Sequence, residues 1–213
     1  MSVLTPRKGG PESIVNPLGG GTAVLATAVA EAEGSRGAAA ALACAGADAD
    51  TAGLLVEVGG RAPRPTLIVA AAAQKLEERL AAHLPLAKVA GRGQICHLAV
   101  PSDAEGLEAA SAAVAVARGA TAVVHVPPRL FRLALEGEAK LRPTGILLRA
   151  DLGRDRALVG LTARELLERD LTVGVLKQRL GWVAERRALF GVLPAGSPGG
   201  LPQRLVRRLS GVT

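Results

Sequence analysis

Short hydrophobic runs recur along the chain and alternate with segments of helical spacing. Five of these runs predict strands, at residues 54–58, 94–100, 120–126, 145–148 and 171–176. They lack a regular alternation of apolar and polar positions, which is typical of parallel strands that are covered on both faces. Helical patterns, such as the one at 74–83 with Leu76 and Leu80 four residues apart, lie between them. The chain is therefore expected to form an α/β domain with a doubly wound, mainly parallel sheet flanked by helices.

The first hydrophobic segment is interrupted by three glycines. Residues 13–33, SIVNPLGGGTAVLATAVAEAE, predict a short strand, a glycine turn and a helix that Gly34 and Gly37 close. Further predicted elements are strands at 38–44 and 66–70, capping-box helix starts at 102–105 and 162–165, and a short helix at 130–136. Pro127 and Pro128 are expected to end the strand before them, because neither can donate a ladder hydrogen bond.

The two ends of the chain differ from its middle. Residues 1–12 predict a flexible N-terminal arm, 13–196 a single α/β domain and 197–213 a basic C-terminal tail. In the tail, leucines recur every fourth residue beside arginines: Leu201, Leu205 and Leu209 with Arg204, Arg207 and Arg208. This amphipathic pattern predicts docking on a protein partner or an anionic membrane surface, or packing on the domain itself. Without a signal-peptide or membrane-spanning pattern, the chain is expected in the cytoplasm, free or peripheral at the membrane.

Charge and composition narrow the classes of function. The formal net charge is +7, and residues 177–213 carry seven basic residues against one acidic residue. Such an excess suits an acidic protein, a membrane surface or nucleic acid. The aromatic residues are two Phe and one Trp, too few to stack single-stranded bases, so sequence-specific nucleic-acid binding is not expected. Cys44 and Cys96 lack metal-ligand spacing and are expected to be buried, reduced thiols, with no metal site.

The glycine turn is the first candidate site. A turn formed by Gly19, Gly20, Gly21 and Thr22 before a helix would present free backbone N–H groups to an anion. Phosphate-binding loops also need a lysine, and none follows Gly21. Simple chain reversal with Thr22 as a helix N-cap is the favoured alternative.

Further candidates lie at the ends of predicted strands. His125 is near the carboxyl end of its strand, where open parallel sheets bind ligands, and Ser102 follows another strand. A core histidine bonded to a carbonyl is the competing interpretation for His125. Cys96 and His97 are adjacent, but successive strand residues point to opposite faces, so they do not predict a catalytic pair. No catalytic residue is assigned.

Several segments together resemble the MinD/ParA group of deviant P-loop ATPases. GGGTAVLATAVAEA is similar to the family's loop and first helix, and LLVEVGG to the strand that ends at the magnesium-side aspartate. ATAVVHVPPRLFRLALE, GILLRAD and VLPAG resemble later segments in the same order. The resemblance implies a P-loop NTPase-like fold. The family's lysines are missing from the loop, and Gly59 and Gly60 stand where its acidic metal partner is expected.

With these departures, the resemblance implies a non-hydrolytic regulatory or positioning protein, in cell division, segregation, or pilus or secretion assembly. It implies a protein partner or a homodimer. No cofactor is assigned, and ATP is the nucleotide that the family would bind. The alternatives are a small-molecule or nucleotide-binding α/β enzyme that uses the carboxyl edge of the sheet, and a docking module that acts through the tail.

Overall fold

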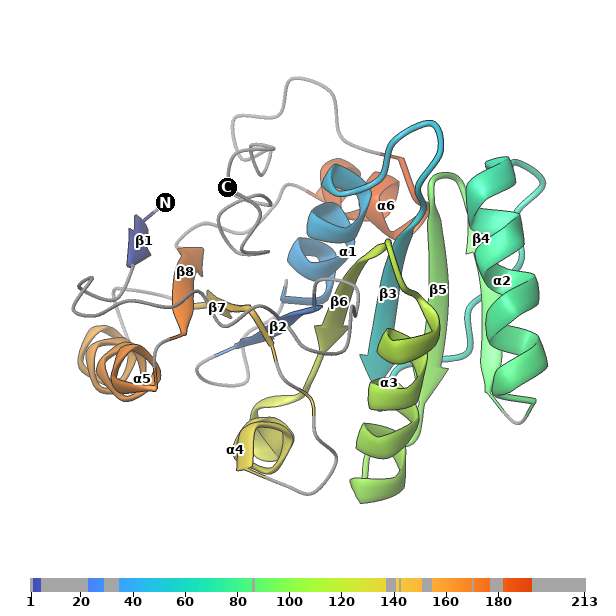
Figure 1. Cartoon of the computed structure of the whole chain (residues 1–213). Helices are drawn as coiled ribbons and strands as arrows, with labels where there is room; N and C mark the ends of the chain where they lie inside the picture. The colour runs from blue at the N-terminus through green and yellow to red at the C-terminus, as the bar shows by residue number, and fades with distance from the viewer. Residues whose placement is uncertain are drawn as a thin grey trace.

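One sheet organises the molecule, and its strands lie in the order β1-β8-β7-β2-β6-β3-β5-β4 (Figure 1). The computed structural model describes residues 2–4, 23–28, 35–85, 87–136, 141, 143–150, 155–169, 171–176 and 182–192. The strands are β1 (Ser2–Leu4), β2 (Ala23–Ala28), β3 (Gly53–Val58), β4 (Lys88–Arg92), β5 (Ile95–Val100), β6 (Thr121–His125), β7 (Gly145–Arg149) and β8 (Thr172–Leu176). Among the described strands, the inner ones are parallel, and the edge strands β1 and β4 pair antiparallel to their neighbours. The predicted mainly parallel α/β fold is confirmed.

Helices cover both faces of this sheet. They are α1 (Ser35–Ala45), α2 (Ala71–His83), α3 (Ala104–Val116), α4 (Pro128–Glu136), α5 (Arg156–Glu168) and α6 (Trp182–Leu189). α1 and α6 pack on one face, and α2 to α5 contribute to the core on the other (Figure 1). Within β3, Leu54 and Val56 face the second group of helices, whereas Leu55 faces α1. The near-continuous hydrophobic runs follow from this double coverage.

The predicted strand at 38–44 is wrong, because these residues form most of α1. Every residue of α1 from Gly37 to Ala45 is buried, between the sheet and α6. Alanine has the highest helix propensity, and its small side chain lets the three layers approach closely. Gly37 lies inside the helix, not at its end, and a Cβ atom there would come within 2.3 Å of Glu185 Cγ in α6. The close approach of α6 thus favours glycine at this position.

The predicted helix after Thr22 is also wrong. Ala23–Ala28 form β2, which lies in the middle of the sheet between β6 and β7. Val24 and Leu25 are fully buried, one toward each face. The alanine content of AVLATA favours a helix, but burial between two parallel neighbours overrides that propensity. The junction between strand and helix therefore falls at residues 29–34, and Gly19 to Thr22 lie outside the described residues.

Most other predicted elements match, but β1 and α6 were not predicted and four further details differ. Segment 66–70 contributes only a single bridge at Val69, and edge strand β4 was not predicted, since KVAGR is short and polar. Asp103, not Ser102, is the N-cap of α3 and accepts a hydrogen bond from Gly106 N at 2.8 Å. Thr162 lies inside α5, which begins six residues earlier. Pro127 ends β6, and α4 begins at Pro128 as expected of a first-turn proline.

The far end of α6 is held by the β4–β5 hairpin. Arg92 Nη1 donates to Leu189 O at 2.9 Å, and the Arg92 guanidinium lies 5.2 Å from the centre of the Phe190 ring. A cation at a helix C-terminus is favourable.

Within the described residues, no helix has the length and hydropathy needed to cross a bilayer. Of the predicted flexible arm, Ser2–Leu4 instead form β1, which pairs with β8, and the other residues of the arm lie outside the described residues, as does the whole predicted tail.

Candidate functional site

A cleft of about 360 Å³ opens at the carboxyl ends of β3 and β6, beside the first turn of α1. Its described lining residues are Arg36, Glu57, Val58, Gly59, Gly60, Arg61, Ser102, His125, Pro127 and Arg129. They come from α1, from β3 and the loop after it, from the loop after β5, and from β6 and α4. Segments far apart in sequence thus meet at one edge of the sheet.

The topology places a crevice beside this cleft, at the carboxyl ends of β2 and β6. α1 follows β2 and packs on one face, whereas α4 follows the neighbouring strand β6 and packs on the other face. Connections that leave adjacent parallel strands toward opposite faces create a crevice, the usual ligand site of open α/β sheets. The predicted carboxyl-edge location is the one where the cleft lies.

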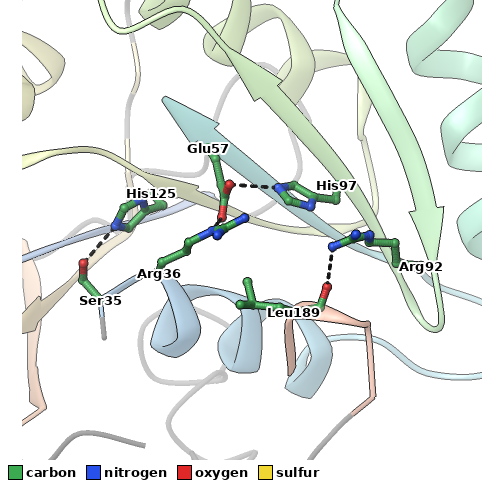
Figure 2. Close-up of polar contacts among 7 residues, drawn as sticks. All are labelled: Ser35, Arg36, Glu57, Arg92, His97, His125 and Leu189. Atoms are coloured by element: carbon green, nitrogen blue, oxygen red, sulfur yellow. Dashed lines mark hydrogen bonds and ion pairs between the residues drawn. The ribbon is translucent and has the colours of Figure 1, made fainter. Parts of the chain in front are cut away.

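Glu57 is the buried acidic residue of this site, with only 1% of its side chain exposed. Arg36 Nε donates to Glu57 Oε1, and His97 Nε2 lies 3.2 Å from Glu57 Oε2 (Figure 2). Burial raises the pKa of the Glu57 carboxyl, but the contacts with His97 and Arg36 outweigh burial and hold this pKa below its ordinary value. Glu57 is therefore an ionised carboxylate: Oε1 accepts from Arg36, and Oε2 lies at ion-pair distance from His97 without an aligned hydrogen-bond donor among the described residues.

Strand register places these side chains together. Glu57 in β3 is the register partner of His125 in β6, so the two lie side by side across the parallel pair. His97 in β5 is opposite Leu55, two residues before Glu57, and thus lies on the same face of the sheet. All three side chains point toward α1, from which Arg36 reaches up to Glu57 (Figure 2). Cys96 faces the other core, so the predicted opposition of Cys96 and His97 is confirmed.

His125 pairs with a serine at the start of α1. Ser35 Oγ lies 2.9 Å from His125 Nε2 (Figure 2). Burial lowers the pKa of His125; the charge of Glu57 partly offsets this effect, and the charge of Arg36 adds to it. Because its pKa is below the ordinary 6.5, the imidazole is neutral at pH 7 and can accept the Ser35 hydroxyl hydrogen.

The opposite wall of the cleft carries further cations. Arg129, in the first turn of α4, donates from Nη2 to Ser102 Oγ at 2.6 Å. His125, Arg129 and Ser102 all line this cleft. Three guanidinium groups, of Arg36, Arg61 and Arg129, and the single carboxylate of Glu57 leave the described lining with a net charge of +2. The cleft is electrostatically suited to an anion.

Comparison with known proteins gives no further guide. No protein-family model, curated protein or solved structure matches the chain.

Of the predicted site residues, Ser102 and His125 lie in this cleft, whereas the others fall outside the described residues. The latter are Gly19, Gly20, Gly21, Thr22, Arg204, Arg207 and Arg208. Sequence reasoning did not assign Arg36 and Glu57 to a site. The available signal was a charged residue interrupting the apolar strand LLVEV, which a buried strand tolerates only with a partner.

The same geometry bears on metal binding and thiol chemistry. Among the described residues, no group of three or more His, Cys, Asp or Glu side chains could hold a metal ion. Cys44 and Cys96 are free and buried, and burial raises the pKa of each thiol to about 12. The predicted buried, reduced thiols are confirmed.

Proposed function

We propose that the protein is a non-hydrolytic regulatory or positioning protein of the MinD/ParA kind, which binds the phosphate groups of a small ligand in this cleft. ATP is the ligand that the family resemblance implies. The observation that carries the proposal is the set of three arginines around the carboxyl edge of the sheet. Arginine presents a planar array of donors that matches phosphate oxygens, and its charge persists at any physiological pH.

Two features support binding without hydrolysis. Phosphoryl transfer in P-loop enzymes relies on a loop lysine and on a magnesium ion held by a hydroxyl and a carboxylate. The segment between β2 and α1, residues 29–34, reads VAEAEG and contains no lysine, and the hydroxyl of Ser35, the first residue of α1, is paired with His125. Glu57, the carboxylate in the described lining, accepts from Arg36 through Oε1, and its Oε2 lies 3.2 Å from His97 Nε2. These residues suit holding a phosphate group better than cleaving it.

The Ser35–His125 pair favours a second candidate, a serine-dependent enzyme. A neutral imidazole 2.9 Å from a hydroxyl is the arrangement of a general base and a nucleophile. Among the described residues, however, no carboxylate hydrogen-bonds to the other ring nitrogen of His125 to fix its tautomer, as catalytic triads require. Labelling of Ser35 by a fluorophosphonate probe, lost in both Ser35→Ala and His125→Gln, would favour this candidate.

Equilibrium binding of ATP and ADP tests the first proposal. Arg129→Ala should weaken binding at least about tenfold, because a hydrogen bond to a charged group contributes roughly 1.5–3 kcal/mol. Arg118→Ala is the matched control: it removes an exposed arginine that lies outside the cleft and should leave affinity unchanged. Equal affinity of Arg129→Ala and the unmodified protein would overturn the placement of the phosphate.

The proposal also includes a cellular role and a partner. A MinD/ParA-like protein without turnover would act through a protein partner or a second copy, in division, segregation, or pilus or secretion assembly. The basic tail with Arg204, Arg207 and Arg208 would contribute contact with that partner or with an anionic membrane surface.

A further inference from the structure

A second, larger hollow adjoins the cationic cleft. It measures about 630 Å³ and lies between the end of α2, the start of β4, the end of β5 and the first turns of α3. Apolar residues dominate its lining, among them Leu84, Ala87, Val100 and Ala109, and His83 also contributes to it. Its size is that of a small-molecule site.

The two spaces share Gly59 and Gly60 in their linings, so they adjoin each other at the loop after β3. A Cβ atom on Gly59 would lie 2.8 Å from Ser102 Oγ, and one on Gly60 would lie 2.5 Å from Glu57 Oε2. Gly59 also has a φ of +74°, which other residues rarely adopt. The glycines thus permit the close packing of Ser102 and Glu57 at the place where the two spaces adjoin.

We infer that the ligand is a phosphate ester with an apolar, ring-sized body. Its phosphate lies among Arg36, Arg61 and Arg129, and its body extends over Gly59 and Gly60 into the hollow lined by Leu84 and Ala109. This inference rests on the proposed function for the position of the phosphate. What it adds is the chemical class of the remainder of the ligand, an apolar ring. The charge of one space and the apolar lining of the other match the two parts of such a molecule.

Three probes distinguish the contribution of the phosphate to binding from that of the apolar body: inorganic phosphate, phenyl phosphate and glycerol 3-phosphate. Phenyl phosphate should bind at least about tenfold tighter than the other two, because only its body gains from leaving water. Glycerol 3-phosphate matches it as a phosphate ester but has a hydrophilic body. Calorimetric titration of the full-length protein measures all three affinities.

The protein's histidines report where each probe lies. The sequence contains three histidines; His125 lines the cationic cleft and His83 lines the hollow. In histidine-selective NMR spectra, inorganic phosphate should shift the ring signals of His125 alone, and phenyl phosphate those of both His125 and His83. A His83→Gln variant assigns the signal.

A substitution that fills the hollow should remove the extra affinity for phenyl phosphate. Ala109→Leu, on the inner side of α3, should abolish the advantage of phenyl phosphate while leaving the affinity for inorganic phosphate unchanged. Ala112→Leu places the same side chain at an exposed position of the same helix and should leave the advantage intact. Thermal melting checks that both variants fold, and the wild-type NMR result stands independently of them.

The outcomes distinguish this inference from the function on which it rests. If no probe binds, both fail. If inorganic phosphate shifts His125 but phenyl phosphate binds no tighter and leaves His83 unmoved, the cationic site stands and the apolar extension is wrong. If phenyl phosphate shifts His83 without His125, the two spaces do not serve one ligand and the inference is also wrong.

Discussion

Arg36, in the first turn of α1, donates to the carboxylate of Glu57, which is buried in β3 (Figure 2). The pair joins the helix to the sheet at the edge of the cleft. Arg36 retains 42% of its side-chain exposure, so it can stabilise the buried carboxylate and still face a ligand. Glu57 thereby sets the position of one of the three arginines.

Removing one member of this pair should cost stability. Arg36→Ala leaves a buried carboxylate with His97 as its remaining partner, and we expect a loss of about 2 kcal/mol in the free energy of unfolding, less than for a fully buried pair. Glu57→Gln keeps the shape and removes the charge, and should cost about 1 kcal/mol. Urea denaturation measures both, and the double variant should cost less than the sum. Strict additivity would contradict the coupling.

Stability should decrease in acid partly because of His125. Its pKa in the folded protein lies below the ordinary 6.5, so its contribution is present above pH 6.5 and is lost as the pH falls through the folded pKa. Glu57 acts in the same direction below its ordinary 4.5. In denaturation series from pH 8 to pH 5, His125→Gln should reduce the slope of stability against pH relative to the unmodified protein. An unchanged slope in His125→Gln would argue against a buried neutral imidazole.

The N-cap of α3 predicts different stability effects for substitutions at the adjacent residues Ser102 and Asp103. Asp103→Ala should lower stability by about 1 kcal/mol, because it removes the acceptor of the Gly106 N–H bond. Ser102→Ala should cost less, since its hydroxyl contacts the exposed Arg129. Thermal melting of the two variants tests this, and a larger loss in Ser102→Ala would restore the capping box predicted from sequence.

The two cysteines should resist modification in the folded protein. Both are buried, and with a pKa of about 12 neither forms appreciable thiolate at pH 8. Iodoacetamide should label neither thiol in buffer and both in urea, as read by intact mass. Rapid labelling of Cys44 in the native protein would contradict its packing against α6.

Sequence alone predicts the parallel sheet because its strands are buried on both faces and read as apolar runs. It fails where alanine dominates. AVLATA forms a strand and the run at 38–44 a helix, the reverse of the prediction, since alanine side chains carry little information about the period and tertiary burial decides.

The site is only half predictable for a related reason. The carboxyl-edge rule finds His125 and Ser102 from strand ends. Arg36, Glu57 and His97 come together because of the order and register of the strands in the sheet. The sequence pattern alone does not give that order or register. Because the strand-to-helix junction was predicted at residues 19–22, Ser35 and Arg36 were not recognised as the first residues of a helix at the edge of the sheet.

Phosphorus-31 NMR of ATP mixed with the protein, with and without magnesium, tests the central claim most directly. It reports binding through the ATP signals and cleavage through the signal of inorganic phosphate. We predict saturable changes in the ATP phosphate signals that do not need magnesium, are lost in Arg129→Ala, and bring no growth of inorganic phosphate. Magnesium-dependent release of phosphate that disappears in Ser35→Ala or His125→Gln, or ATP signals that stay unchanged at saturating protein, would contradict it.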